Sequence, residues 1–159
     1  MLKYLFNFFM CAILGLALIG CSNLGQLNYK QTRMLKNQGF TLSEEGWTLS
    51  LPQNLLFDFD QSNIRADQRA ELEALAKRLQ NYNLNKVKIV GHTDDVGNKN
   101  YNKILSAKRA SSVSQIFLAA GFNSNNLQSI GRGESQPLLD NNNAKNRALN
   151  RRVNIIIIP

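Results

Sequence analysis

The stretch Gly91–Ala110, GHTDDVGNKNYNKILSAKRA, contains a strand end, a polar loop and the start of a long helix. Asn102, Ser106 and Arg109 follow one another at spacings of four and three, so they share one stripe of this helix. Further along, the same stripe consists of Val113, Ile116, Phe117 and Ala120, which should face a core. A core-facing stripe that is polar only at its N-terminal end predicts a pocket there, beside the loop that follows the strand.

Further elements of regular structure are expected on both sides of this stretch. Alternating apolar residues predict strands, and apolar residues at helical spacing predict helices. The expected strands cover residues 47–51, 55–60, 86–90, 127–130 and 152–158. The expected helices cover 66–81 and 100–120. A helical turn is expected at 147–150 and a turn at Gly131–Gly133. The last strand ends apolar on both faces, which favours a central place in the sheet. The order β-α-β-α-β-β predicts an α/β sandwich, with two main helices packed on one face of a mixed sheet.

The first 20 residues have the pattern of an export signal. Lys3 precedes an apolar run that is too short for a comfortable membrane span. The run ends in Leu18-Ile19-Gly20-Cys21, which resembles the bacterial lipobox. This resemblance implies cleavage before Cys21 and lipidation of Cys21, whose acyl chains, palmitate among them, would provide membrane affinity. We therefore expect a lipoprotein signal peptide over 1–20, a lipidated Cys21 with a tether over 21–45 that has a short helical piece around 31–37, and a globular domain over 46–159.

Composition limits the partners and the chemistry. The 159 residues carry a formal net charge of +8, which favours anionic partners such as nucleic acid, anionic lipid or a carboxylate-rich polymer. Export argues against nucleic acid. The two cysteines are Cys11, inside the signal, and Cys21, so the mature domain has no disulfide and no catalytic thiol. His92 is the only histidine, which excludes a zinc site built on several histidines. No metal and no other cofactor is expected.

The predicted pocket has one residue of each charge. Ligands of α/β sheets collect where strands end and helices begin, and the loop after residue 91 occupies such a position. Asp94 is a carboxylate acceptor, and Arg109 has a forked, permanently charged donor two turns into the helix. Such a pair suits a zwitterion, because a carboxylate binds an ammonium and a guanidinium binds a carboxylate in two places. From spacing alone, an ion pair between Asp94 and Arg109 themselves is equally well supported.

Five ordered blocks of the sequence resemble the OmpA-like peptidoglycan-binding domain. They are Phe57-Asp58-Phe59-Asp60, GHTDDVG from Gly91, Tyr101-Asn102 with Leu105-Ser106-Ala107-Lys108-Arg109-Ala110, GRGESQP from Gly131, and Asn150-Arg151-Arg152-Val153. The resemblance covers about Gly46 to Pro159 and implies the α/β sandwich of that family. The chain departs from the family pattern in having Asn146-Arg147 where Gly-Arg is usual.

The resemblance implies noncovalent binding of the diaminopimelate in peptidoglycan stem peptides. The family's two signature ligand residues match Asp94 and Arg109 in identity and in their separation of fifteen positions. By this resemblance Arg109 would bind a diaminopimelate carboxylate, and Asp94 would hold charged or amide nitrogen. Asn102 would add hydrogen bonds, and Arg151 would close the pocket as a second cation. Further candidates for the lining are Thr93, Leu105, Asp60 and Asn63.

The expected function is that of a lipid-anchored outer-membrane protein. Its domain would face the periplasm and tether the envelope to the cell wall, with the peptidoglycan stem peptide as partner and the outer membrane bound through Cys21. Ser22 after the cysteine favours the outer membrane by the usual bacterial sorting rule. One alternative is a regulatory lipoprotein whose tether binds an envelope protein. Another is a peptidoglycan hydrolase, although no pair of carboxylates is placed persuasively for catalysis.

Overall fold

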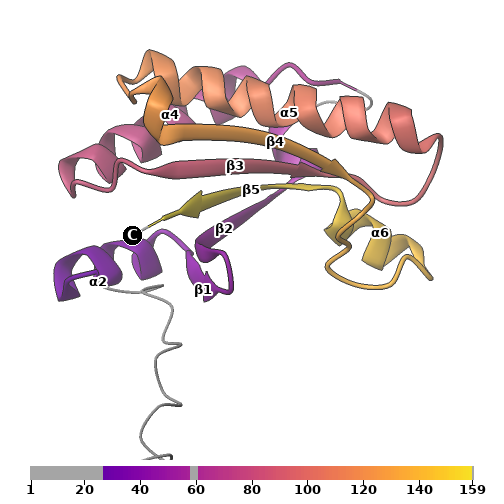
Figure 1. Cartoon of the computed structure of the whole chain (residues 1–159), viewed down its shortest axis with the longest axis horizontal. Helices are drawn as coiled ribbons and strands as arrows, with labels where there is room; N and C mark the ends of the chain where they lie inside the picture. Colours follow the sequence, from indigo (N-terminus) through magenta and orange to yellow (C-terminus); the bar gives the residue numbers. More distant parts are fainter. Residues whose placement is uncertain (1–26, 58–60, 159) are drawn as a thin grey trace, which may run out of the picture.

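The structure, a computed structural model, describes residues 27–57 and 61–158 (Figure 1). The expected signal peptide, Cys21 and Asp60 lie outside these ranges. Among the residues described, no helix is both long enough and apolar enough to cross a membrane. Helices pack on a mixed five-stranded sheet, so the α/β class expected from the sequence is confirmed.

The sheet has the strand order β1-β2-β5-β3-β4. Its strands are β1 (Thr41–Ser43), β2 (Gly46–Pro52), β3 (Val87–His92), β4 (Leu127–Gly133) and β5 (Arg152–Ile157). β3 and β4 are parallel, whereas every other neighbouring pair is antiparallel. β5 lies between β2 and β3, and Ile155 and Ile156, which point to opposite faces, are both buried. The C-terminal strand is therefore central, as its apolar end predicts.

Two long helices, α4 (Ala66–Asn81) and α5 (Lys99–Ala119), cover one face of the sheet (Figure 1). Their bounds agree with the expected ranges to within one residue. The predicted stripe of α5 is buried along its length, from Asn102, Ser106 and Arg109 to Val113, Ile116 and Phe117. The shorter helices are α2 (Tyr29–Asn37), α3 (Gln53–Leu56) and α6 (Ala144–Asn150), with a 3-10 turn, η1, at Ser124–Asn126. The expected core-facing helix with a polar N-terminal half is thus confirmed.

Glycines bring α5 into direct contact with β3 and β4. A Cβ atom at Gly91 would lie 2.1 Å from the carbonyl oxygen of Ser106, and one at Gly131 would lie 2.3 Å from the backbone nitrogen of Ala107. Any other residue would push the helix away, so glycine is needed at both positions. Ser106 Oγ also accepts a hydrogen bond of 2.8 Å from the Gly133 amide. The half of α5 that carries Asn102 and Arg109 is therefore fixed on the strand ends.

The segment between α2 and β2 packs on the folded unit. Asn28 caps α2 through a reciprocal pair of hydrogen bonds with Gln31, and Met34 and Leu35 of α2 are buried with Phe40 in the core. β1 then pairs with β2 in a tight hairpin. The short helix expected around 31–37 is present. However, from Tyr29 onward the range expected to be a tether consists of elements that contribute to the core and the sheet.

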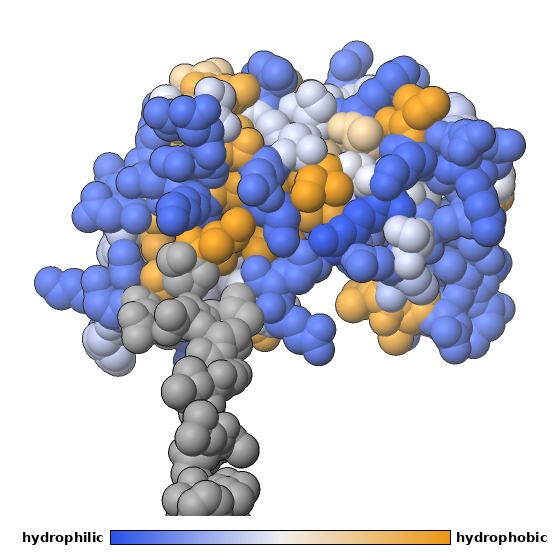
Figure 2. All heavy atoms as spheres, in the orientation of Figure 1, coloured by the Kyte–Doolittle hydropathy of each residue, from blue (hydrophilic) through white to orange (hydrophobic). Residues whose placement is uncertain are grey.

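A cluster of charged residues, Glu45, Lys88 and Arg132, ties this hairpin to the far side of the sheet. Glu45 lies in the β1–β2 turn and accepts a hydrogen bond of 2.7 Å from Lys88 Nζ of β3. Its two carboxylate oxygens also accept bonds of 2.6 and 2.8 Å from the guanidinium of Arg132 on β4. The hydrogen bonds from Arg132 are the largest cause of a lowered pKa of Glu45, from 4.5 to about 2. The cluster lies on the sheet face away from α5, because Lys88 and Arg132 alternate with Ile89, which is in the core, and Gly131, which contacts α5. On this side of the sheet, Figure 2 shows a hollow between the α2 and α6 ends, bordered by hydrophilic and hydrophobic residues.

Two local expectations are wrong. Leu55 and Leu56 lie at the end of the short helix α3, not in an extended segment, because Pro52 ends β2 and the Phe57 amide bonds back to Gln53 at 2.9 Å. Gly131–Gly133 continues β4 instead of forming a turn, since its glycines serve the close approach of α5.

Candidate functional site

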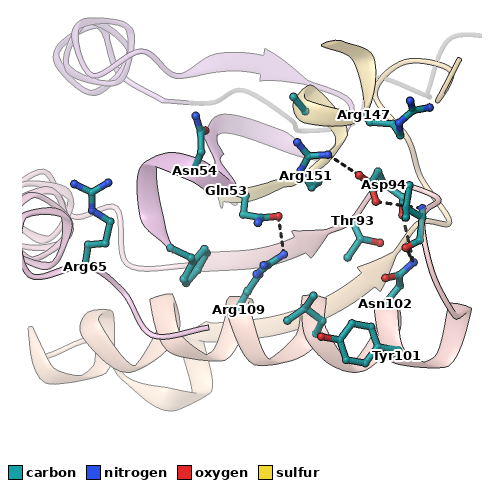
Figure 3. A pocket seen from close by; sticks show the side chains of 14 residues that line it. Gln53, Asn54, Arg65, Thr93, Asp94, Tyr101, Asn102, Arg109, Arg147 and Arg151 are labelled. Atoms are coloured by element: carbon teal, nitrogen blue, oxygen red, sulfur yellow. Dashed lines mark hydrogen bonds and ion pairs between the residues drawn. The ribbon is translucent and has the colours of Figure 1, made fainter. Parts of the chain in front are cut away.

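A cavity of about 710 Å³ lies where β3 ends, bordered by the β3–α5 loop, the N-terminal half of α5, α3 and α6 (Figure 3). Six residues predicted from the sequence line it together: Asp94, Arg109, Asn102, Arg151, Thr93 and Leu105. Asn63 is exposed and does not line the cavity, and Asp60 lies outside the described residues. A volume of this size is typical of pockets that hold a drug-sized ligand.

Asp94 is fixed on the cavity wall by two contacts. Its Oδ2 lies 2.6 Å from Arg151 Nη1, and its Oδ1 accepts a hydrogen bond of 3.2 Å from the Val96 amide. The side chain of Asp94 is 11% exposed. Asp94 is therefore held in one orientation, and its ion pair is with Arg151 and not with Arg109.

Arg109 is anchored from the opposite wall. Its Nε donates to the Gln61 carbonyl oxygen at 3.1 Å, and its Nη1 donates to Gln53 Oε1 at 2.8 Å. The guanidinium carbon lies 5.5 Å from the ring centre of Phe57, within cation–π range. Arg109 is 3% exposed, so α5, α3 and the segment after α3 together determine where its charge lies.

Asn102 connects the loop that carries Asp94 to Glu134, the residue after β4. Its Nδ2 lies within hydrogen-bonding distance of Val96 O and Glu134 Oε2, both at 3.1 Å, and of Asp94 O at 3.4 Å. These contacts hold the β3–α5 loop against α5, and Glu134 serves as a structural acceptor there. The amide nitrogen is used within the protein, so a ligand would donate its hydrogen bond to Asn102 Oδ1.

Thr93 presents a buried polar atom at the cavity. Its backbone amide donates to the Gly133 carbonyl oxygen at 2.9 Å, which sets the direction of the chain after β3. Its Oγ1 is buried without a hydrogen-bond partner among the described residues. A buried hydroxyl in this state is costly, and a polar ligand atom that bonds to it would remove the penalty.

The wall formed by α6 is built around Asn150. Its fully buried side chain accepts from the Leu138 and Leu139 amides at 2.7 and 3.1 Å and donates to Leu139 O at 2.7 Å. Arg151 follows directly, and its carbonyl oxygen accepts from the Gln53 amide at 2.9 Å. Asn150 therefore positions the arginine that pairs with Asp94.

The departure at residue 146 leaves this wall intact. Asn146 lies within α6, and its Nδ2 donates to Asp140 O at 2.8 Å, which secures the preceding loop. Arg147, on the cavity side, donates to Asn141 O at 2.6 Å. The side chain of Asn146 takes part in the loop's hydrogen bonding, a role that a glycine could not fill.

Sequence reasoning missed several lining residues, among them Gln53, Arg65, Val96, Tyr101 and Arg147. Val96 and Tyr101 belong to two of the five sequence blocks, and helical spacing from Arg151 could have suggested Arg147. Gln53 and Arg65 come from the segments around α3 and before α4, for which the sequence shows no functional pattern.

The fold and the cavity together define an α/β domain in which acidic and basic side chains line a cavity at the end of a strand. The chain belongs to the OmpA family, whose family model matches residues 56–151. The chain is 37% identical over 148 residues to the outer-membrane lipoprotein YfiB of Pseudomonas aeruginosa, covering 91% of this chain and 87% of that protein. It is 29% identical over 128 residues to the peptidoglycan-associated lipoprotein of Rhizobium meliloti, covering 79% and 73%.

Solved structures with the same fold support this assignment. A putative MotB-like protein from Desulfovibrio vulgaris has a TM-score of 0.67 at 28% identity, covering 79% of this chain and 85% of that one. The peptidoglycan-associated lipoprotein from Burkholderia pseudomallei has a TM-score of 0.59 at 26% identity, covering 69% and 89%. The fold expected from the family resemblance is therefore confirmed.

Proposed function

We propose that this chain is a lipid-anchored outer-membrane protein that binds diaminopimelate-containing peptidoglycan noncovalently and tethers the envelope to the cell wall. The observation that carries the proposal is that Asp94 and Arg109 line one cavity but have different partners. Relatives named outer-membrane lipoprotein and peptidoglycan-associated lipoprotein support it. The proposed role is binding, without catalysis.

The two charged residues would bind the two ends of a zwitterion. Arg109 now donates to a neutral acceptor, Gln53 Oε1, at 2.8 Å. A diaminopimelate carboxylate would replace this amide oxygen, and a charge-assisted bond is roughly twice as strong as a neutral one. The diaminopimelate ammonium would approach Asp94, whose carboxylate Arg151 and the Val96 amide already orient. Asp94 would then be oriented before the ligand arrives, which favours affinity, whereas the Gln53 side chain would have to move aside.

Sedimentation with purified sacculi tests the proposal. The wild-type domain should be retained, and Asp94→Asn or Arg109→Lys should reduce retention at least tenfold, because each loses one charge or one bidentate contact. Asp95→Asn is the matched control, since Asp95 is the exposed neighbour of Asp94 and does not line the cavity. Undiminished retention of both cavity variants would disprove the assigned site, and release of soluble muropeptides would favour the hydrolase.

The lipid anchor needs its own test. Cys21→Ser should abolish incorporation of labelled palmitate and release the protein from the membrane fraction. Labelling that survives this substitution would contradict attachment at Cys21.

The regulatory alternative, in which residues 21–45 bind an envelope protein, stays a prediction. Deleting α2 would uncover the core, because Met34 and Leu35 are buried in it. Replacing the exposed Tyr29 and Arg33 is the better test, since a partner that binds there should be lost while sacculus binding persists.

A further inference from the structure

The cavity extends past Arg109 to a second cationic end. Asp94 and Arg151 lie at one end, and Arg65 lies beyond Arg109 in the opposite direction (Figure 3). With a volume of about 710 Å³, the cavity exceeds what the end of one diaminopimelate side chain would fill. A longer piece of the same peptide therefore fits along it.

Arg65 is held at this end by the backbone. Its amide donates to the Leu56 carbonyl oxygen at 3.1 Å, and its neighbour Ile64 forms a bridge with Phe57. Phe57 in turn lies beneath the guanidinium of Arg109. The start of α4 and the end of α3 thus place Arg65 at the end of the cavity beyond Arg109 (Figure 3).

The ion pair of Arg65 with Asp67 would not prevent Arg65 from binding a ligand. Arg65 Nη2 lies 3.2 Å from Asp67 Oδ2, and the two side chains are 45% and 57% exposed. Such surface pairs contribute little to stability, so a second carboxylate could approach Arg65 at small cost. Arg69, one turn further along α4, is also exposed but does not line the cavity.

We propose that Arg65 forms a second anion subsite, which binds another carboxylate of the peptide whose diaminopimelate lies between Asp94 and Arg109. This inference rests on the proposed function and adds a selectivity for peptides with an additional free carboxylate. Two groups can supply it: the α-carboxylate of a γ-linked glutamate that precedes diaminopimelate, or the carboxylate at the C-terminus of the peptide.

Calorimetry with synthetic L-Ala-γ-D-Glu-diaminopimelate tests the subsite. The ligand is used unmodified, with the glutamate α-carboxylate amidated, or with the C-terminal carboxylate amidated. One of the two amidations should weaken wild-type binding about two- to fivefold, the effect of an exposed charge pair, and thereby identifies the source. Arg65→Gln should bind the unmodified peptide as weakly as the wild type binds that amidated peptide, and it should no longer distinguish the two. Arg69→Gln should behave like the wild type.

The outcomes separate this inference from the proposed function. If both amidated peptides bind the wild type as tightly as the unmodified one, or if Arg65→Gln still discriminates between them, the subsite is disproved. If the wild type still binds the peptide in that case, and Asp94→Asn abolishes this binding, the proposed function stands without the subsite. If the wild type binds none of the peptides, the proposed function and the subsite are both overturned.

Discussion

Acidification from pH 7 to pH 5 should destabilise the protein through His92. His92 is the only histidine of the chain, and its side chain is 2% exposed. Burial, followed by the positive charges of Arg152 and Arg132, lowers its pKa from 6.5 to about 3, although Glu45 acts in the opposite direction. The unfolded chain binds a proton near pH 6.5, whereas the folded protein does not do so until about pH 3. Stability therefore falls as the pH drops below 6.5.

The size of this effect follows from the two pKa values. At pH 5 the difference is 6.5 − 5 = 1.5 pH units, and each unit corresponds to about 1.36 kcal/mol, so about 2 kcal/mol of unfolding free energy should be lost. By pH 3 the loss would reach about 4 kcal/mol, because the folded protein is itself half protonated at its own pKa. A loss of about 2 kcal/mol is a large fraction of the stability of an ordinary domain.

Urea unfolding of a tag-free protein between pH 7 and pH 5 measures this loss. The wild-type midpoint should fall steadily, and His92→Gln should give a nearly flat profile over the same range. An NMR titration of the His92 ring serves if that variant does not fold, and its signals should not titrate above about pH 4. A wild-type midpoint that is equal at pH 7 and pH 5, or a ring that titrates near pH 6.5, would refute the reasoning.

Two further predictions concern the scaffold. Glu45→Gln should lower stability at pH 7 and make stability depend less on pH in acid. The reason is that the stabilising contribution of Glu45 is present above pH 4.5 and is lost as the pH falls towards 2. An unchanged urea midpoint at pH 7 would show that the pair with Arg132 contributes nothing. Gly131→Ala should cost about 1–3 kcal/mol and weaken sacculus binding, because α5 must move about 3.4 − 2.3 = 1.1 Å to clear Ala107. An equal loss in Ser129→Ala, on the same strand, would contradict this explanation.

Periodic patterns predicted the parts of the fold that face a core. The stripe of α5 and the bounds of α4 followed from spacing alone, because a long helix with one buried face has a strong signature. The place of β5 followed from its apolar end. In contrast, the packing of α2 was not predicted, since only Met34 and Leu35 mark its buried side within a polar stretch.

Six of the residues that line the candidate site were predictable, but their pairings were not. Asp94 and Arg109 could be located by sequence, yet their partners depend on segments that meet only in three dimensions. Arg151 lies 57 positions from Asp94, and Gln53 lies 56 positions from Arg109. Periodicity carries no information at such separations. Consequently, the choice between a mutual ion pair and an open pocket required the structure.

The relative positions of α2 and the cavity determine how the domain would carry mechanical load. The described chain begins at the end of the sheet where β5 finishes, and the cavity lies near α6 at the other end (Figure 1). Tension between residue 27 and a ligand held by Asp94 and Arg151 would pull β2 lengthwise against β5. These strands are paired in six positions from Trp47 to Pro52, with hydrogen bonds perpendicular to the pull. The bonds would be loaded together in shear instead of opening one after another, a geometry suited to a connection that must resist sustained force.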